Sequence, residues 1–212
     1  MLKRLDAVEL TPAVLALIVM NLVPLIGVFF FAWDAGTIVF LYWLENVVIG
    51  LLNIPKILSC RDDDKPRTMG GVIYLCFFFS LHYGLFCGGH YMFLKTTYPD
   101  LPEFGGMIGT LTAPVLFWSL LGLTFSHIVS LFVNFYGKGE YKTRSPNKQM
   151  FMPYSRIVLL HVVIVLSGFA VIAAGQGIVT LALLVGFKII FDLAAHIVEH
   201  SNEDNLINPG VG

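Results

Sequence analysis

The chain has 212 residues, of which 57% are hydrophobic and 13% are charged, and its mean hydropathy is +0.79. Soluble domains carry about 25% charged residues, so this composition excludes an ordinary soluble domain and indicates a chain that is solvated by a lipid bilayer. The formal net charge of -1 excludes the basic surface that nucleic-acid-binding domains carry. We therefore expect a single integral membrane domain over residues 1–212 and no nucleic-acid partner.

Six apolar runs follow one another along the chain, each close to the about 20 residues that a membrane span needs. The first run follows two basic residues, as in a signal peptide, but it has the length of a span and no small-residue cleavage site follows, so we expect a permanent helix. Segments rich in Gly, Pro and Asp separate the runs. The sequence predicts an all-α transmembrane bundle of about six spans, over residues 12–31, 37–58, 71–94, 111–136, 154–174 and 177–198.

Lysine and arginine residues give this bundle a direction, because positive residues near span ends stay in the cytoplasm. In a six-span arrangement only Lys95 falls on the outer side, and Lys188 lies within a span. We therefore expect both termini in the cytoplasm. The basic residues on the expected inner side are Lys3, Arg4, Lys56, Arg61, Lys65, Arg67, Lys138, Lys142, Arg144, Lys148 and Arg156.

All six histidines lie in or at the edge of the predicted spans, together with several carboxylates. Ionisable groups inside a span are costly and are functional candidates by default. Counted from the middle of each span at about 1.5 Å per residue, most of them fall between the midplane and the cytoplasmic face. His90 is the exception, since it points toward the outer leaflet and is expected to meet water or the outer loop.

The densest pattern is on the last predicted helix, where ionisable residues recur at every fourth position from Lys188 to His200 and so share one face. An Asp followed four residues later by a His can ligate a divalent cation, and zinc suits such N and O donors. Two other interpretations stay open: an intrahelical Lys188–Asp192 pair with the histidines in packing roles, and a proton relay. The predicted metal ligands are His82, His127, His161, Asp192, His196 and His200.

Glu45 lies near the middle of the second predicted span, beside Asn46. A carboxylate at that depth is protonated unless a cation or a metal stabilises it, and Lys188 at similar depth is the expected partner. With a metal nearby, Glu45 is a candidate general base toward metal-bound water, and Lys188 is the second catalytic candidate. The structural alternative is that the two side chains only join helices.

Small residues on the third predicted helix indicate close helix packing, at Gly84 and Gly88. We expect these positions to allow close approach of a neighbouring helix.

Three sequence stretches together resemble a bacterial family of small integral membrane proteins of unknown function. They are Tyr42-Trp43-Leu44-Glu45-Asn46, His82-Tyr83-Gly84 with His90 following, and the stripe from Lys188 to His200. The resemblance implies the prokaryotic inner membrane and no particular activity. A looser chemical analogy links the pair His196 and His200 to membrane hydrolases of the ceramidase and adiponectin-receptor type, which hold zinc among helix-borne histidines. This chain departs from them at Phe78, where their motif has a serine four residues before the histidine.

Two functions from different classes follow from these residues. The first is a metal-dependent membrane enzyme, a hydrolase of a lipid or another bilayer-soluble substrate, in which metal-bound water attacks and Glu45 moves the proton. The second is a proton-coupled transporter or carrier that uses the same residues as a relay. A membrane subunit whose polar residues only set packing is a third interpretation.

Overall fold

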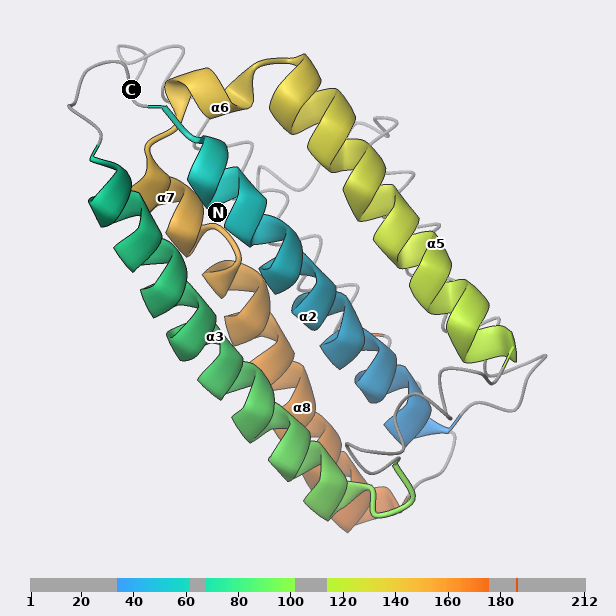
Figure 1. The fold of residues 1–212 in the computed structure, drawn as a ribbon. Helices are drawn as coiled ribbons and strands as arrows, with labels where there is room; N and C mark the ends of the chain where they lie inside the picture. Colours follow the sequence, from blue (N-terminus) through green and yellow to red (C-terminus); the bar gives the residue numbers. More distant parts are fainter. Residues whose placement is uncertain (1–33, 62–67, 102–113, 176–185, 187–212) are drawn as a thin grey trace, which may run out of the picture. The chain divides into compact units, whose positions relative to one another are not determined.

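The computed structural model describes residues 34–61, 68–101, 114–175 and 186. The chain divides into two compact units, one of residues 1–35 with 170–212 and the other of residues 36–169. The second unit holds nearly all the described residues, and every contact below lies within it. All regular elements of the described residues are helical, which confirms the all-α prediction for them (Figure 1).

Seven helical elements occupy the described residues, and some of them join end to end. The π-helical segment η3 continues α5 without a break, and α7 leads into α8 through Met152 and Pro153. The elements are α2 (Ala35–Ser59), α3 (Met69–Thr97), α5 (Pro114–Ser130), η3 (Leu131–Gly137), α6 (Glu140–Thr143), α7 (Pro146–Phe151) and α8 (Tyr154–Ala174).

Four helices are long and apolar enough to cross a membrane, as expected of a multi-pass membrane protein. They confirm that four of the six predicted runs form long apolar helices, with ends that differ from the predicted ones by up to eight residues. The predicted spans at residues 12–31 and 177–198 lie outside the described residues. The four helices are Ala35–Ser59, Met69–Thr97, Phe117–Gly137 and Pro146–Ala173.

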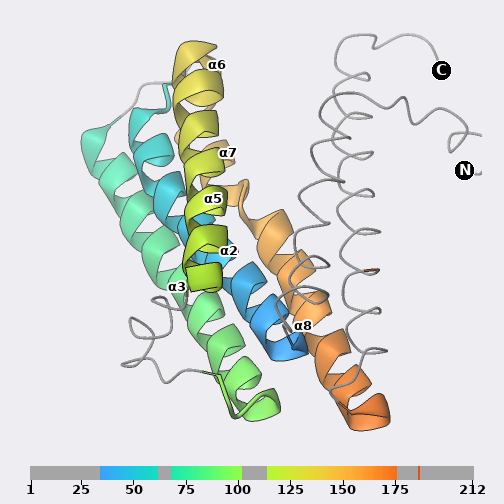
Figure 2. The same cartoon turned by 90° about the vertical axis from the view of Figure 1, so that its right-hand side faces the viewer.

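Helices α2 and α3 lie side by side and run in opposite directions (Figures 1 and 2). An added Cβ at Gly50 would lie 2.5 Å from Tyr83 Cε1, and one at Gly36 would lie 3.0 Å from the Tyr98 ring. Between these points the Trp43 indole N–H donates to the Cys87 carbonyl at 2.8 Å. The closest approach therefore uses a glycine of α2, with a tyrosine ring of α3 filling the space that a side chain would take.

The other two long helices keep the alternation of direction that consecutive membrane spans require. Helix α8 runs parallel to α3, because His82 meets Tyr154 and His90 meets His161 further along both helices. The segment of α5 and η3 runs parallel to α2 (Figure 1). Its His127 meets Glu45, and its Tyr136 hydroxyl lies 2.9 Å from that of Ser59 near the C-terminal end of α2.

The glycine-packing prediction for the third predicted helix stays a prediction, because the described residues show no close approach at its glycines. A Cβ at Gly84 or Gly88 would meet no atom of the described residues within 4 Å. Close approach instead occurs at Gly50 of α2 and at Gly168 of α8, where a Cβ would lie 3.2 Å from Phe93 Cζ. Glycine spacing does not say which face of an apolar helix meets a neighbour, so the residues alone could not make this distinction.

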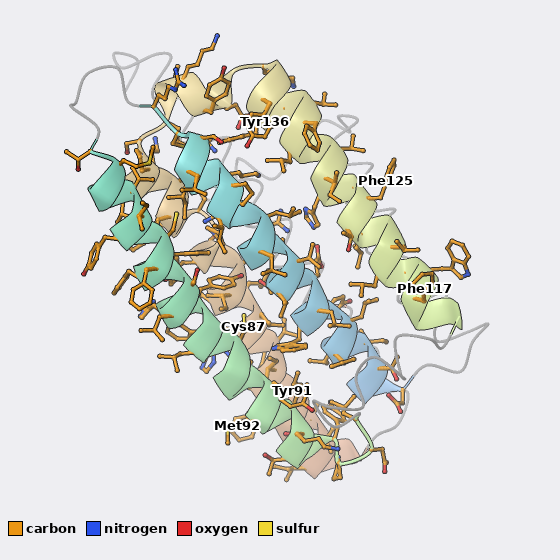
Figure 3. All side chains as sticks on the ribbon, in the orientation of Figure 1. Cys87, Tyr91, Met92, Phe117, Phe125 and Tyr136 are labelled. Carbon is orange, nitrogen blue, oxygen red and sulfur yellow. The ribbon has the colours of Figure 1, made fainter. Side chains whose placement is uncertain are left out.

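Outward-facing side chains of the long helices are large and apolar. Phe125 of α5 is 69% exposed and Met92 of α3 is 73% exposed, and Figure 3 shows both among similar side chains. Soluble monomers rarely expose continuous apolar surface of this kind. This surface is compatible with a lipid bilayer environment.

The basic segment between η3 and α8, which separates the fourth and fifth predicted spans, contains two short helices. Gly139 precedes α6 with a φ of 75°, a left-handed conformation that favours glycine. Ser145 caps α7 by accepting from the Lys148 backbone N–H at 3.3 Å, with Pro146 at the first helical position. Gln149 of α7 is buried and donates through Nε2 to Asn53 Oδ1 of α2 at 2.7 Å. This pair ties the inter-helix segment to α2.

Candidate functional site

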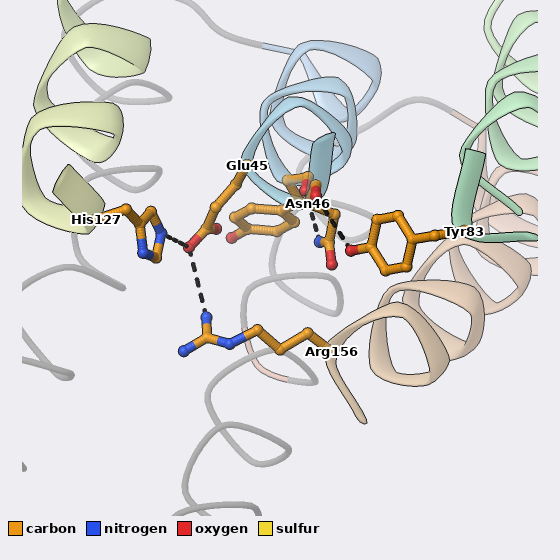
Figure 4. A network of polar contacts seen from close by, with 6 residues as sticks. Glu45, Asn46, Tyr83, His127 and Arg156 are labelled. Atoms are coloured by element: carbon orange, nitrogen blue, oxygen red, sulfur yellow. Dashed lines mark hydrogen bonds and ion pairs between the residues drawn. The ribbon is translucent and has the colours of Figure 1, made fainter. Parts of the chain in front are cut away.

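A carboxylate on α2 is shared between side chains of two other helices (Figure 4). Glu45 Oε1 lies 3.4 Å from His127 Nε2 of α5 and 3.8 Å from an Arg156 guanidinium nitrogen of α8. The side chains of Glu45 and His127 are 15% and 24% exposed, whereas that of Arg156 is 56% exposed. We call these three residues the Glu45 cluster. It brings one acidic and two basic groups together from three separate helices.

The Glu45 cluster lies near the middle of the candidate membrane spans. His127 is the central residue of Phe117–Gly137, and Glu45 lies close to the centre of Ala35–Ser59. Charges at such depth are expensive and are retained where they face partners or a water-filled path. The cluster is therefore the strongest functional candidate in the part of the chain that the structure describes.

Hydrogen bonds beside Glu45 hold its helix in place. Asn46 is buried and its Nδ2 donates to the Tyr42 carbonyl at 2.9 Å, while its own carbonyl accepts from the Tyr83 hydroxyl of α3 at 3.1 Å (Figure 4). The Trp43 bond to Cys87 lies less than one turn away. These contacts fix α2 against α3 and so orient Glu45 toward α5 and α8.

A second pair of ionisable groups joins α3 to α8. His90 Nε2 lies 3.1 Å from His161 Nδ1, and the two ring centroids are 5.3 Å apart. His90 is 6% exposed, and its other nitrogen, Nδ1, has no hydrogen-bond partner in the described part of the chain. His161 is exposed.

A third histidine, His82, contacts mainly aromatic side chains. His82 Nδ1 lies 2.7 Å from the Tyr154 hydroxyl, and the imidazole stacks on Phe78 at 5.3 Å with 12° between the ring planes. Phe86 meets the same ring edge-on at 5.1 Å. His82 is exposed, so these contacts lie beside the exposed apolar side chains of α3 rather than within the Glu45 cluster.

The structure distributes the predicted site residues over separate places. His82, His127 and His161 belong to three different contacts, and the described residues contain no group of three or more ligand side chains that could hold a metal ion. Glu45 meets His127, which agrees with their predicted proximity in depth. The remaining predicted residues lie outside the described residues: Lys188, Asp192, His196 and His200.

The sequence did not predict the contacts that two further residues make, Arg156 and His90. Arg156 was expected among the cytoplasmic charges at the start of the fifth predicted span, but its guanidinium lies 3.8 Å from Glu45. His90 was expected to meet water or the outer loop, but it is buried against His161. The predicted span at 154–174 has the bounds of α8, so its position along the helix did not identify the contact of Arg156. No sequence signal identified the His90 partner.

Comparison with known protein families assigns the chain to one of them. A family described as "Family of unknown function (DUF6498)" matches residues 4–206, which is nearly the whole chain. The chain belongs to the DUF6498 family. No curated protein and no solved structure matches it. Membership agrees with the expected resemblance to a family of unknown function and assigns no reaction, so the function of this DUF6498 protein has to be argued from its site.

Proposed function

We propose that this DUF6498 protein is a proton-coupled membrane carrier that binds and releases a proton at Glu45. Its proposed setting is the prokaryotic inner membrane, with six spans and both termini in the cytoplasm. The one-sided distribution of lysine and arginine supports this orientation. The alternating directions of the four described long helices support the order of crossings.

The observation that carries the proposal is the sharing of the Glu45 carboxylate by His127 and Arg156. Ionised Glu45 attracts both basic groups and so draws α5 and α8 toward α2. Protonated Glu45 loses most of that attraction, because the Coulomb energy vanishes with the charge while an ordinary hydrogen bond is weaker than a charge-assisted one. Proton binding at one atom therefore changes the contacts of three helices, which is the coupling that a carrier needs.

Replacing Glu45 by Gln tests the proposal directly, because the amide keeps the shape and removes the titration. In purified protein the wild type should develop the infrared C=O band of a protonated carboxylic acid on acidification, and Glu45→Gln should lack that component. In proteoliposomes with an imposed membrane potential, wild type should conduct protons and Glu45→Gln should not.

Glu140→Gln is the matched control, since Glu140 lies in α6 and pairs with Arg144 outside the Glu45 cluster. It should keep the Glu45 component of the band and the flux. Wild-type flux in Glu45→Gln, or a C=O band from which this change removes no component, would contradict the proposed role of Glu45.

A metal-dependent hydrolase of a lipid or bilayer-soluble substrate is the second candidate function. The observation that favours it is the 3.4 Å contact between His127, a predicted zinc ligand, and Glu45, the predicted general base. The described residues alone do not form a ligand set, so this proposal depends on Asp192 and His196 joining one or two of the histidines. Elemental analysis of purified wild type and His196→Ala tests it: stoichiometric zinc lost in the variant supports a ligand role, and zinc-free folded wild type contradicts it.

A further inference from the structure

Three aromatic rings pack together where the C-terminal end of α2 meets η3 and α6. The ring centroids of Phe135, Tyr136 and Tyr141 lie between 5.3 and 6.2 Å apart. Phe135 is buried, and Figure 3 labels Tyr136 at this end of the helices. We call these three residues the Tyr141 cluster. Tyrosine rings, which join an apolar face to a hydroxyl group, are typical of the level where lipid headgroups meet acyl chains.

Hydrogen bonds fix the Tyr141 cluster to α2. The Arg61 backbone N–H donates to the Tyr141 carbonyl at 2.7 Å, and the Tyr136 hydroxyl lies 2.9 Å from that of Ser59. These bonds hold α6 against the end of α2. The preference of basic loops for the cytoplasm requires only their charge and no particular fold. A basic segment whose backbone is fixed in this way can in addition recognise a ligand.

Two lysine ammonium groups lie over rings of the Tyr141 cluster. Lys56 Nζ is 5.4 Å from the centroid of Phe135, and Lys142 Nζ is 5.8 Å from that of Tyr141. In the part of the chain that the structure describes, no carboxylate forms an ion pair with either ammonium group. Lys56 is half-buried, and a charge removed from water without an anionic partner is costly. An anion bound from outside would therefore stabilise this end of the bundle.

The acidic residues of this region leave the two lysines unpaired among the described contacts. Glu140 of α6 pairs with Arg144 at 3.5 Å instead. The run Asp62-Asp63-Asp64 follows Arg61 in the sequence and lies outside the described residues.

Exposed apolar side chains lie next to the Tyr141 cluster. Phe132 of η3 is 62% exposed, and its ring centroid is 6.0 Å from that of Tyr136. Val129, three residues earlier, is 40% exposed. A phospholipid has its phosphate beside its acyl chains, so one such molecule can cover both the ammonium groups and these apolar side chains.

We propose that the Tyr141 cluster and its two lysines bind the headgroup of an anionic phospholipid. Phosphate oxygens accept from the ammonium groups of Lys56 and Lys142, and an acyl chain lies along Phe132 and Val129. Basic pockets between membrane helices bind headgroups of the cardiolipin class, which carry two phosphates. The site goes beyond the proposed proton coupling and does not depend on Glu45, so Glu45→Gln should bind the lipid as wild type does.

Native mass spectrometry of the detergent-purified protein tests the lipid selectivity. Wild type should retain cardiolipin in preference to phosphatidylcholine. Lys56→Gln/Lys142→Gln should raise the apparent Kd for cardiolipin about 30-fold, because each lysine near an anionic lipid contributes a factor of about five. Lys142→Gln alone should raise it about fivefold, and this exposed position keeps the test independent of folding at half-buried Lys56.

Lys138→Gln/Lys148→Gln is the matched control, because it removes the same charge from the same basic segment at two exposed lysines. Neither of these lysines lies over a ring in the described contacts. The apparent Kd should stay within about twofold of wild type, because charges away from the headgroup act through screening solvent. Equal weakening in the two double variants would overturn the site, since total charge alone would then explain binding.

Three further outcomes would also overturn the proposal. Equal retention of cardiolipin and phosphatidylcholine by wild type would mean that the lysines do not select an anionic lipid. Displacement of cardiolipin by millimolar inorganic phosphate would assign the lysines to a free anion. Binding that appears only after Asp62, Asp63 and Asp64 are changed to asparagine would show that this run occupies the lysines in the natural chain.

Discussion

At the scale of single residues, Trp43 joins two helices through one nitrogen atom. Its indole N–H donates to the Cys87 carbonyl at 2.8 Å, and its ring stacks on Phe40 at 5.6 Å. Figure 3 labels Cys87 on the neighbouring helix. Trp43→Phe removes the donor and part of the ring, so we expect a loss of about 1–2 kcal/mol in the free energy of unfolding. Reversible unfolding in mixed detergent micelles measures it.

Trp118→Phe provides the control for that change, since Trp118 is 68% exposed on α5. The same substitution there should leave stability within about 0.5 kcal/mol of wild type. Equal losses at the two positions would show that the indole of Trp43 contributes nothing through its bond to Cys87.

The sequence predicted which ionisable side chains lie inside the spans, but it did not predict which of them contact one another. Counting depth along the spans put Glu45 and His82 near the midplane and His127 a few residues toward the cytoplasm. The structure brings Glu45 and His127 together, whereas His82 lies on the exposed side of α3 against Tyr154. Depth depends only on position along a helix, whereas contact also depends on rotation. In helices that are apolar on every side, no polar face reveals that rotation.

At the scale of helices, the contact of α2 and α3 depends on the missing side chain of Gly50. A Cβ there would lie 2.5 Å from Tyr83 Cε1, and Tyr83 is buried and bonded to the Asn46 carbonyl. Gly50→Ala must therefore push the ring or the helix aside, at a cost of about 1–3 kcal/mol. Gly84→Ala, which meets no described atom, should instead be neutral or stabilising by up to about 1 kcal/mol. Detergent unfolding of both variants checks the contrast, and equal destabilisation would contradict it.

Two hydrogen-bonded side chains also join helix α7 to helix α2. Gln149 Nε2 donates to Asn53 Oδ1 at 2.7 Å, and Asn53 Nδ2 donates back to the Gln149 carbonyl at 3.3 Å. Both side chains are 2% exposed, so Asn53→Ala or Gln149→Ala leaves a buried polar group unpaired and should cost about 1–3 kcal/mol.

A double-mutant cycle separates this pair from simple loss of packing. The double variant should lose less than the sum of the single losses, because no unpaired partner is left behind. Lys148→Ala, on the exposed side of α7, serves as the control and should stay within about 0.5 kcal/mol of wild type. Strictly additive losses would show that the two side chains do not interact.

Hydropathy predicted which segments form long helices, but it predicted the ends of those helices less accurately. The predicted spans at 37–58 and 71–94 match α2 and α3 within three residues at each end. The predicted span at 154–174 has the bounds of α8, and the candidate membrane span begins earlier, at Pro146, because it includes α7. Basic and polar residues between 138 and 148 lower the hydropathy before α8, so the short helix α7 was not predicted, although Ser145 and Pro146 begin it and Gln149 bonds to Asn53.

At the scale of the whole molecule, the direction of the chain across the membrane decides which side of the Glu45 cluster faces the cytoplasm. In the proposed orientation α2 and α5 run inward while α3 and α8 run outward, so the contact of His90 with His161 lies on the outer side of the Glu45 cluster. The basic segment from Lys138 to Lys148 favours that orientation, because it would have to leave the cytoplasm if the bundle were inverted.

Reporter fusions test the orientation and the number of crossings together. With six spans, a fusion after Gly212 should fluoresce with a green fluorescent protein and lack alkaline phosphatase activity, whereas a fusion after Gly175 should behave in the opposite way. The physical reason is that residues 177–198 form an apolar run of span length that returns the chain to the basic side. A fusion after Lys148 is the internal control and should match the full-length fusion. Phosphatase activity at both Gly175 and Gly212 would mean that this last run does not cross, and would place the stripe from Lys188 to His200 outside the bundle.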